Sequence, residues 1–325
     1  MKTRHVQISE RDGFERKAVP CTFTVDFARG DFRPGDPSRL FDPEGQEQAI
    51  QVDAAQAWED GSVRRADVTF SVKVAPMTER TFRFEYGAGA TPEAKQLSPM
   101  EVRDGGDPVE VQQGPVIYQF RRRGFNLVDQ VIFGEKRFLR PGSRGWVLVM
   151  KDGRELTPEG ESRITPETRG PRAARLRVEG TYPGGFGFVT RVTCFSRVSW
   201  IMAEHEVVSG DAGQVAAVVA ESDFHLPEAP LFSAFGARQR ADGQATNWAV
   251  VTDRVSTVDA ATVGAWSEAG PVRCEVEPDG RFRAIFPFAK KPLVIYYHYL
   301  ITPPMDHHHS PAPSMATDPA CRVMA

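Results

Sequence analysis

The sequence contains few cysteines, no long apolar run and no concentrated basic charge. Its 325 residues include four cysteines, Cys21, Cys194, Cys274 and Cys321. None belongs to a Cys-x-x-Cys pair, so the spacing favours neither a zinc site nor a disulfide framework. We therefore expect no metal site and no cofactor. Cys21 and Cys194 lie in apolar, strand-like runs, which predicts buried thiols.

Membranes and nucleic acids are not expected as partners. No segment reaches the run of about 18 apolar residues that a membrane-spanning helix needs. Lysine and arginine number 40 against 43 aspartates and glutamates, and the richest basic cluster is Arg121-Arg122-Arg123. Three adjacent arginines do not form the basic stripe that is typical of a nucleic-acid surface.

The N-terminus also lacks an apolar segment. Residues Met1 to Ile8 carry charges, which predicts that there is no signal peptide and that the protein is cytoplasmic. A secreted protein whose signal peptide had been removed would show the same pattern.

Turn-forming residues are plentiful instead, and they predict an all-β fold. The chain holds 28 glycines and 25 prolines, which leaves little room for long helices. Polar and apolar residues alternate over Thr22–Phe27 and Thr81–Tyr86, as in half-buried strands. Between them, Asp60-Gly61 is typical of a tight hairpin turn, because glycine accepts the positive φ that such turns need.

We expect three regions along the chain. Residues 1–108 form a first β domain, of which residues 88–108 lack periodicity and are interpreted as a linker or long crossover. Residues 109–302 carry about eleven short strands at the spacing of an antiparallel β-sandwich. Residues 303–325 are rich in Pro, Ser, Ala and His and are predicted to be disordered. Two segments, 214–220 and 259–266, fit a short helix as well as a strand.

Both β domains carry motifs that resemble one known family. The first contains Trp58-Glu59-Asp60-Gly61-Ser62 and Phe82-Arg83-Phe84-Glu85-Tyr86-Gly87. It resembles the N-terminal RIFT-type barrel of the exo-rhamnogalacturonan lyase-like (YetA-like) proteins. The second contains Arg123-Gly124-Phe125-Asn126-Leu127 and Arg177-Val178-Glu179-Gly180, and it resembles the central β-sandwich of that family. The resemblance implies a RIFT-like β-barrel followed by an antiparallel β-sandwich.

The same resemblance implies a carbohydrate-related module. Members of the family carry a third domain, an α/α toroid in which polysaccharide cleavage is thought to occur, and its residues have no counterparts in this sequence. We therefore favour polysaccharide binding or scaffolding over catalysis. The expected partners are a carbohydrate and either a separate catalytic chain or further copies of this one. The alternatives are a stand-alone lyase or hydrolase acting on an acidic sugar at the interdomain cleft, and a structural protein without a ligand.

Trp58 and Asp60 form the best-defined candidate for a ligand-binding site. An indole face can stack on a pyranose while a carboxylate binds its hydroxyls. The alternative is structural, with Trp58 filling the barrel and Asp60-Gly61 making a turn. Arg121 and Arg123 are further ligand-binding candidates, because a cation can neutralise the carboxylate of an acidic sugar.

Candidate catalytic residues lie in the second domain. In a strand, Glu204 and Glu206 share one face and His205 points to the other. Two carboxylates on one face can couple for acid–base work, although a solvated strand face explains the same pattern. A uronate lyase needs a cation and a base, and the residues that offer these groups are Arg121, Arg123 and Arg191, and Tyr182, His225 and His298. The tract His307-His308-His309 lacks a further ligand at metal-binding spacing and is interpreted as part of a mobile tail.

Overall fold

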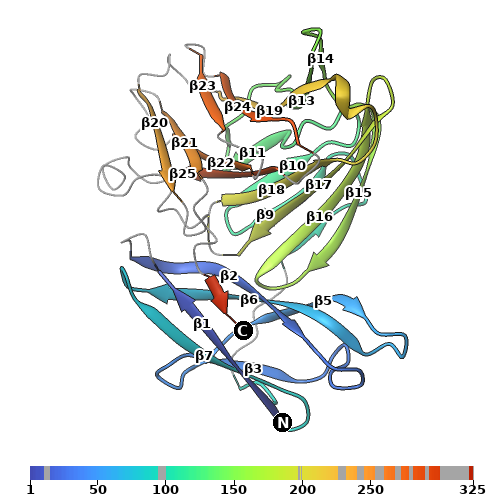
Figure 1. The fold of residues 1–325 in the computed structure, drawn as a ribbon. Coiled ribbons are helices and arrows are strands. Elements are labelled where there is room, and N and C mark those ends of the chain that lie inside the picture. Colours follow the sequence, from blue (N-terminus) through green and yellow to red (C-terminus); the bar gives the residue numbers. More distant parts are fainter. Residues whose placement is uncertain are drawn as a thin grey trace. The chain divides into compact units, whose positions relative to one another are not determined.

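The computed structural model describes residues 1–10, 15–93, 100–196, 198, 200–225, 232–239, 245–252, 260–267, 272–277, 281–289, 293–300 and 322–324. Within these ranges the chain is built from β-strands and one 3-10 turn, η1 (Ala212–Gln214) (Figure 1). The predicted all-β fold class is confirmed. The two segments that also fit helices are instead the strands β19 (Val215–Asp223) and β22 (Ala260–Ser267), each paired on both sides.

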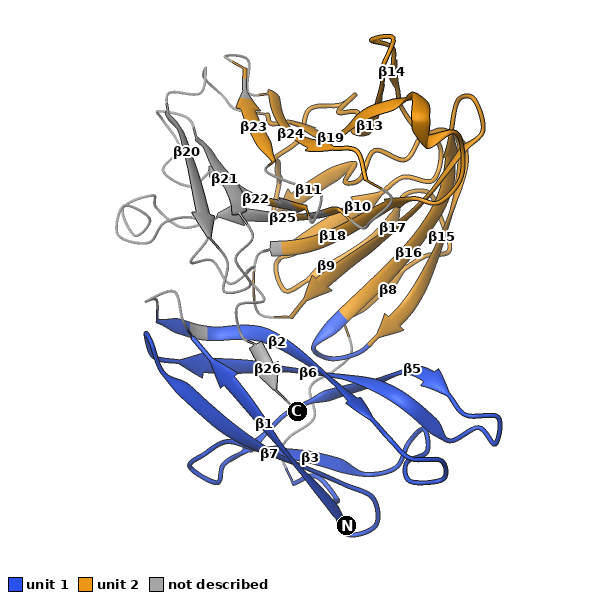
Figure 2. Cartoon of the chain, viewed as in Figure 1, with its two compact units in different colours: residues 1–99, 170–173, 318–325 blue, residues 100–169, 174–317 orange. Residues whose placement is uncertain are grey.

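Two compact units divide the chain (Figure 2). Unit 1 comprises residues 1–99, 170–173 and 318–325, and unit 2 comprises residues 100–169 and 174–317. A strand, β8 (Glu101–Arg103), lies within the expected linker and pairs with β9 (Val109–Gln113). Most of the expected disordered tail lies outside the described residues, but β26 (Arg322–Met324) pairs with β1 (Lys2–Ser9).

Unit 1 is made of two antiparallel sheets. The first has the strand order β26-β1-β7-β3-β4 and the second β2-β6-β5. The strands not yet placed are β2 (Arg16–Asp26), β3 (Ser38–Phe41), β4 (Glu47–Gln48), β5 (Gln51–Ala57), β6 (Val63–Val74) and β7 (Glu79–Tyr86).

Aromatic side chains fill the interior of unit 1. Strict alternation in β2 and β7 directs Phe23, Phe82 and Phe84 to one side, where all are buried. The Phe23 ring meets the rings of Phe70 and Phe84 edge-on, at centroid distances of 5.9 and 5.7 Å. Such edge-to-face contacts add specificity to the burial of apolar area, so this unit has a core of its own.

Residues 170–173 complete the hydrogen bonding of unit 1. The Gln51 side-chain oxygen accepts hydrogen bonds from the backbone amides of Arg172 and Ala173, both at 2.8 Å. The Gln51 side-chain nitrogen donates to the Ala173 carbonyl at 3.0 Å. Because Gln51 is buried, these bonds satisfy an amide that would otherwise destabilise the fold.

Unit 2 contains three antiparallel sheets. Their strand orders are β12-β11-β10-β9-β8, β14-β13-β19-β24-β23 and β15-β16-β17-β18-β25-β22-β21-β20. The strands not yet placed are β10 (Val116–Phe120), β11 (Gln130–Phe133), β12 (Lys136–Arg137), β13 (Gly145–Met150), β14 (Glu155–Leu156), β15 (Glu159–Arg169), β16 (Ala173–Tyr182), β17 (Phe186–Phe195), β18 (Trp200–Val207), β20 (Phe232–Gln239), β21 (Ala245–Thr252), β23 (Arg273–Val276), β24 (Arg281–Pro287) and β25 (Leu293–Leu300).

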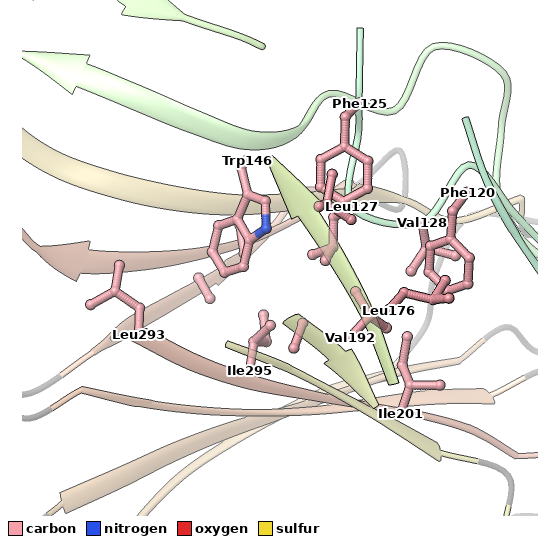
Figure 3. Close-up of a cluster of buried hydrophobic side chains, with 14 of the residues drawn as sticks. Phe120, Phe125, Leu127, Val128, Trp146, Leu176, Val192, Ile201, Leu293 and Ile295 are labelled. Carbon is pink, nitrogen blue, oxygen red and sulfur yellow. The ribbon is translucent and has the colours of Figure 1, made fainter. Parts of the chain in front are cut away.

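One hydrophobic cluster forms the core of unit 2. Trp146 on β13 and Phe125 converge with Val192, Ile201 and Ile295 from the eight-stranded sheet (Figure 3). All five are fully buried, and every second residue of the contributing strands points to this side. Cys194 belongs to the same cluster and Cys21 is buried in unit 1, so both predicted buried thiols are confirmed.

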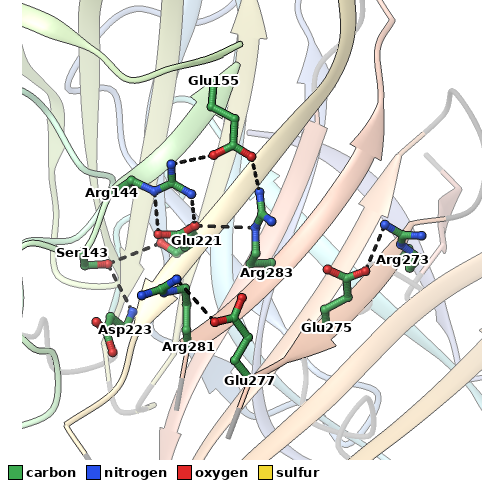
Figure 4. Close-up of polar contacts among 10 residues, drawn as sticks. All are labelled: Ser143, Arg144, Glu155, Glu221, Asp223, Arg273, Glu275, Glu277, Arg281 and Arg283. Atoms are coloured by element: carbon green, nitrogen blue, oxygen red, sulfur yellow. Dashed lines mark hydrogen bonds and ion pairs between the residues drawn. The ribbon is translucent and has the colours of Figure 1, made fainter. Parts of the chain in front are cut away.

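The other side of β13, β19 and β24 carries a network of ion pairs (Figure 4). Glu221 on β19 accepts two hydrogen bonds from Arg144, at 2.8 and 2.5 Å, and lies 3.5 Å from the Arg283 Nε atom. Glu155 bridges the same two arginines, at 2.6 Å from Arg144 and 2.8 Å from Arg283. The Glu221 side chain is only 4% exposed, so its charge depends on these partners.

Candidate functional site

The turn at Trp58 is held by its own backbone and by Asp60. The Trp58 amide donates to the Ser62 carbonyl at 2.7 Å, and Gly61 supplies the positive φ of 78°. One Asp60 oxygen accepts from the Ser62 amide at 3.0 Å and from its hydroxyl at 2.5 Å. These hydrogen bonds lower the pKa of Asp60, with smaller contributions from the charges of Arg29 and Arg33. Turn chemistry therefore accounts for the Asp-Gly-Ser sequence.

The Trp58 indole is engaged on two sides. Its nitrogen donates to the Phe27 carbonyl at 3.1 Å, and the guanidinium of Arg64 lies 5.1 Å from the ring centroid. The cation–π contact covers one face of the indole. Trp58 is half-buried. A sugar ring stacking on that face would have to displace Arg64.

Arg121 and Arg123 follow a strand rather than lying in it. Strand β10 ends at Phe120. The Arg121 Nε donates to the Gly124 carbonyl at 2.8 Å and lies 3.6 Å from Asp129, while Arg123 is exposed and forms an isolated bridge with Glu161. Both arginines belong to unit 2, whereas Trp58 and Asp60 belong to unit 1.

His205 and Tyr182 lie in the core of unit 2. His205 is fully buried, with its Nδ1 atom 2.8 Å from the Thr190 hydroxyl and its Nε2 atom 3.1 Å from the Tyr182 hydroxyl. Its ring stacks on Trp146 at a centroid distance of 4.3 Å. Burial lowers the pKa of His205 to about 3 and raises the pKa of Tyr182 well above its usual value. Both groups are therefore neutral at physiological pH and are enclosed by side chains.

Arg191, Glu204 and Glu206 lie on the opposite face of the same sheet. Strand alternation places Glu204 and Glu206 together and His205 behind them, as the sequence predicts. In the register of β17 and β18, Arg191 is the direct partner of Glu204. The Arg191 Nε also lies 3.3 Å from a Glu167 oxygen on β15.

Strands β15 and β16 extend this cluster. Arg177 lies 2.9 Å from Glu179 and 4.0 Å from the same Glu167 oxygen that Arg191 approaches. The hydrogen bond from Arg177 lowers the pKa of Glu179. We call this cluster the charged face, and its members are Glu167, Arg177, Glu179, Arg191, Glu204 and Glu206. It offers guanidinium donors and carboxylate acceptors side by side, and these groups are half-exposed.

The proposed lyase residues do not converge. Arg191 is separated from Tyr182 and His205 by the thickness of the sheet, because neighbouring residues of a strand alternate in direction. His225 is exposed just beyond β19, where its amide donates to the Phe138 carbonyl at 2.8 Å. His298 lies on β25 opposite Trp200, and its side chain is outside the described part of the structure.

Three members of the charged face were not selected as site residues from the sequence: Arg177 and Glu179 on β16, and Glu167 on β15. The position of Glu167 depends on the pairing of β15 with β16, whose register shifts between Glu159 and Arg163 and again between Pro166 and Thr168. Irregular pairing of this kind moves side chains between faces, so alternation alone does not predict their neighbours.

The described residues show neither a metal cluster nor a spanning helix. Within those residues, His, Cys, Asp and Glu side chains do not gather in groups of three that could hold a metal ion. A search of the same residues finds no helix with the length and apolarity to cross a membrane.

Comparison with known proteins supports the barrel most directly. Residues 6–85 match the family model described as the PcRGLX-like N-terminal RIFT barrel domain. No curated protein matches the sequence.

Two solved structures share the fold over 99% of this chain. One is an alpha-mannosidase from Enterococcus faecalis V583, with a TM-score of 0.59 and 11% identity. The other is a protein in glycosyl hydrolase family 38 from Enterococcus faecalis, with a TM-score of 0.57 and 12% identity. The chain spans 45% and 47% of their lengths, and at these identities the likeness shows the fold alone. Residues 6–85 therefore form a RIFT barrel, within a chain whose β fold recurs in part of two larger proteins.

Proposed function

We propose that this chain is a carbohydrate-binding β module that holds a polysaccharide on the charged face without cleaving it. The observation that carries the proposal is the match of residues 6–85 to the RIFT barrel of rhamnogalacturonan lyase-like proteins. The two solved structures with a similar fold, an alpha-mannosidase and a protein in glycosyl hydrolase family 38, support the same substrate class.

The charged face has the chemistry that sugar hydroxyls require. A hydroxyl both donates and accepts, and here guanidinium and carboxylate groups stand next to each other. The side chains of Arg191 and Glu167 are 38% and 28% exposed. Ion pairs this exposed contribute about 0–1 kcal/mol each, so hydroxyls can replace them at little cost.

Two of the candidate bases are placed where they cannot act on the charged face. β-Elimination requires a base and a cation on the same side of the sugar, within hydrogen-bonding reach. Tyr182 and His205 are enclosed in the core, whereas Arg191 points the other way. Tyr182 and His205 therefore cannot reach a glycan on the charged face, which leaves the carboxylates Glu204 and Glu206 as the acid–base candidates beside Arg191.

A panel of neutral and acidic polysaccharides in affinity gels tests the proposal. We expect retarded migration with at least one glycan, no ultraviolet absorbance from unsaturated products, and weaker retardation in Arg191→Ala. Arg65→Ala is the matched control, because Arg65 is 45% exposed in unit 1 and is also paired with a carboxylate, that of Asp26.

Three outcomes contradict the proposal. Product absorbance would establish a lyase instead, and failure to bind any glycan would leave a structural protein. Glycan binding that persists in Arg191→Ala but is lost in Trp58→Ala would move the site to the Trp58 turn.

A further inference from the structure

A pocket opens in unit 2 where three chain segments meet. They are the hairpin of β13 and β14, the loop before β17, and η1. The pocket has a volume of about 150 Å³, below the range of about 300–1,000 Å³ that is usual for sites of drug-sized ligands, so its occupant is limited to a single small ring. Its lining residues are Met150, Arg154, Leu156, Pro183, Gly184, Phe186, Asp211 and Gln214.

The floor of the pocket is apolar and firmly packed. Phe186 and Met150 are 4% and 3% exposed. The Phe186 ring lies so close to Gly210 that a Cβ at Gly210 would stand 2.2 Å from it. Since Gly210 also has a φ of 106°, only glycine fits there, and the ring is held in a fixed place.

Backbone hydrogen bonds join the segments that form the rim. The Lys151 amide donates to the Gln214 carbonyl at 2.8 Å, which fixes η1 against the hairpin. The Met150 amide donates to the Arg154 carbonyl at 2.8 Å. The pocket is thus already formed by local structure, which reduces the cost of ordering it around a ligand.

Three polar side chains of different kinds stand on the rim. The Asp211 carboxylate accepts from the Gly213 amide and from the Gln214 side chain, both at 2.9 Å, so its orientation is fixed. The Arg154 Nε donates to Asp152 at 2.8 Å, and its side chain is 65% exposed. Among the described residues no contact involves the Arg154 Nη groups or the Gln214 side-chain oxygen. The Nη groups can therefore donate hydrogen bonds to a ligand, and the Gln214 oxygen can accept one.

We infer that this pocket binds one pyranose ring of a neutral sugar. The apolar floor receives the C–H face of the ring, while Arg154, Asp211 and Gln214 bind neighbouring hydroxyls on its edge. Arg154 is already paired with Asp152, and Asp211 adds a second carboxylate, which favours a neutral sugar over an anionic one. The choice of a sugar among polyhydroxylated ligands rests on the proposed function, but the pocket is separate from the charged face in its residues.

Saturation-transfer NMR and calorimetric titration of the full chain test this inference. The probes are D-mannose, D-glucose and D-galactose, with D-galacturonate as the anionic comparison and glycerol as the small polyol. We expect the binding of one neutral sugar to reach saturation. Arg154→Ala and Gln214→Ala should each weaken it roughly tenfold, the loss expected for one hydrogen bond to a charged or polar rim group. Arg103→Ala, which removes an arginine that is 55% exposed elsewhere in unit 2, should leave binding unchanged.

The possible failures are distinguishable. The inference is overturned if no monosaccharide saturates, if D-galacturonate binds best, or if both pocket variants bind as the wild type does. Polysaccharide binding that depends on Arg191 without any monosaccharide binding would overturn this inference and leave the proposed function standing. If instead a monosaccharide binds, its binding is lost in the pocket variants and no polysaccharide binds, the proposed function is overturned and this inference stands.

Discussion

A neutral histidine in the core makes the stability of unit 2 depend on pH. His205 has a folded-state pKa of about 3, because burial disfavours its charged form, against 6.5 when exposed to water. Above pH 6.5 His205 is neutral in both the folded and the unfolded chain, so it does not change how the free energy of unfolding depends on pH. Below pH 6.5 the unfolded chain takes up a proton that the folded chain cannot accept, so the free energy of unfolding falls as the pH falls.

We expect the wild type to lose about 2 kcal/mol more than His205→Gln between pH 7 and pH 5. Urea unfolding at both pH values measures this difference. The control is Val208→Ala, since Val208 is 53% exposed and its substitution removes no titratable group. Parallel pH profiles for wild type and His205→Gln would contradict the assignment.

For single residues, the sequence predicts which strand face a side chain lies on but not which face is buried. Alternation correctly placed Glu204 and Glu206 on one face and His205 on the other. It did not reveal that the His205 side faces the core, since Trp146, Thr190 and Tyr182 come from other strands. Which face is buried depends on contacts between distant segments, and these are not encoded in local spacing.

At the scale of the strand, the network around Glu221 joins β13, β14, β19 and β24. Burial opposes the charge of Glu155, yet hydrogen bonds from Arg144 and Arg283 outweigh it and lower the pKa of Glu155. The two arginines therefore keep the Glu155 carboxylate ionised. Without Glu221, both arginines would still pair with Glu155, but they would lose their contacts with the buried carboxylate.

Glu221→Ala should destabilise the protein by about 1.5–3 kcal/mol, because Arg144 and Arg283 lose their contacts with the buried Glu221 carboxylate but keep Glu155 as a partner. Glu277→Ala is the control on the same sheet. Glu277 pairs with Arg281 at 3.3 Å but is 42% exposed, so its loss should cost at most about 1 kcal/mol. Chemical unfolding of both variants measures the two values. Equal losses would show that burial of the network does not matter.

The sequence predicts where strands lie better than it predicts which strands pair with each other. Alternation and Asp-Gly turns indicated the strands of unit 1, but the possible helices at 214–220 and 259–266 proved to be β19 and β22. Both are rich in alanine and valine, and short apolar runs of this kind have no period that separates strand from helix. Pairing with β24 and β25 settles their conformation.

For the whole molecule, the two units have separate cores. Phe84 belongs to the aromatic cluster of unit 1, while the cluster around Trp146 contains only residues of unit 2. We expect Phe84→Ala to cost about 3–5 kcal/mol, as large-to-small changes in a packed core do. Hydrogen exchange should then show lost protection in β1 and β7 and retained protection in β17 and β18.

Phe188→Ala gives the reverse test, since Phe188 packs on Tyr182 and His205 in unit 2. Its loss should expose β17 and β18 and spare β1 and β7. Equal loss of protection in both units for either variant would show that they unfold as a single cooperative body.

The position of residues 170–173 has a consequence for how the coding sequence of the barrel can be transferred between genes. These residues bond Gln51 in the barrel, but in the gene they follow the coding segment of β15 and include the first codon of β16. A recombination event that transferred only residues 1–99 would carry Gln51 away from the backbone groups that satisfy it. A barrel transferred in this way would be less stable than one transferred together with residues 170–173.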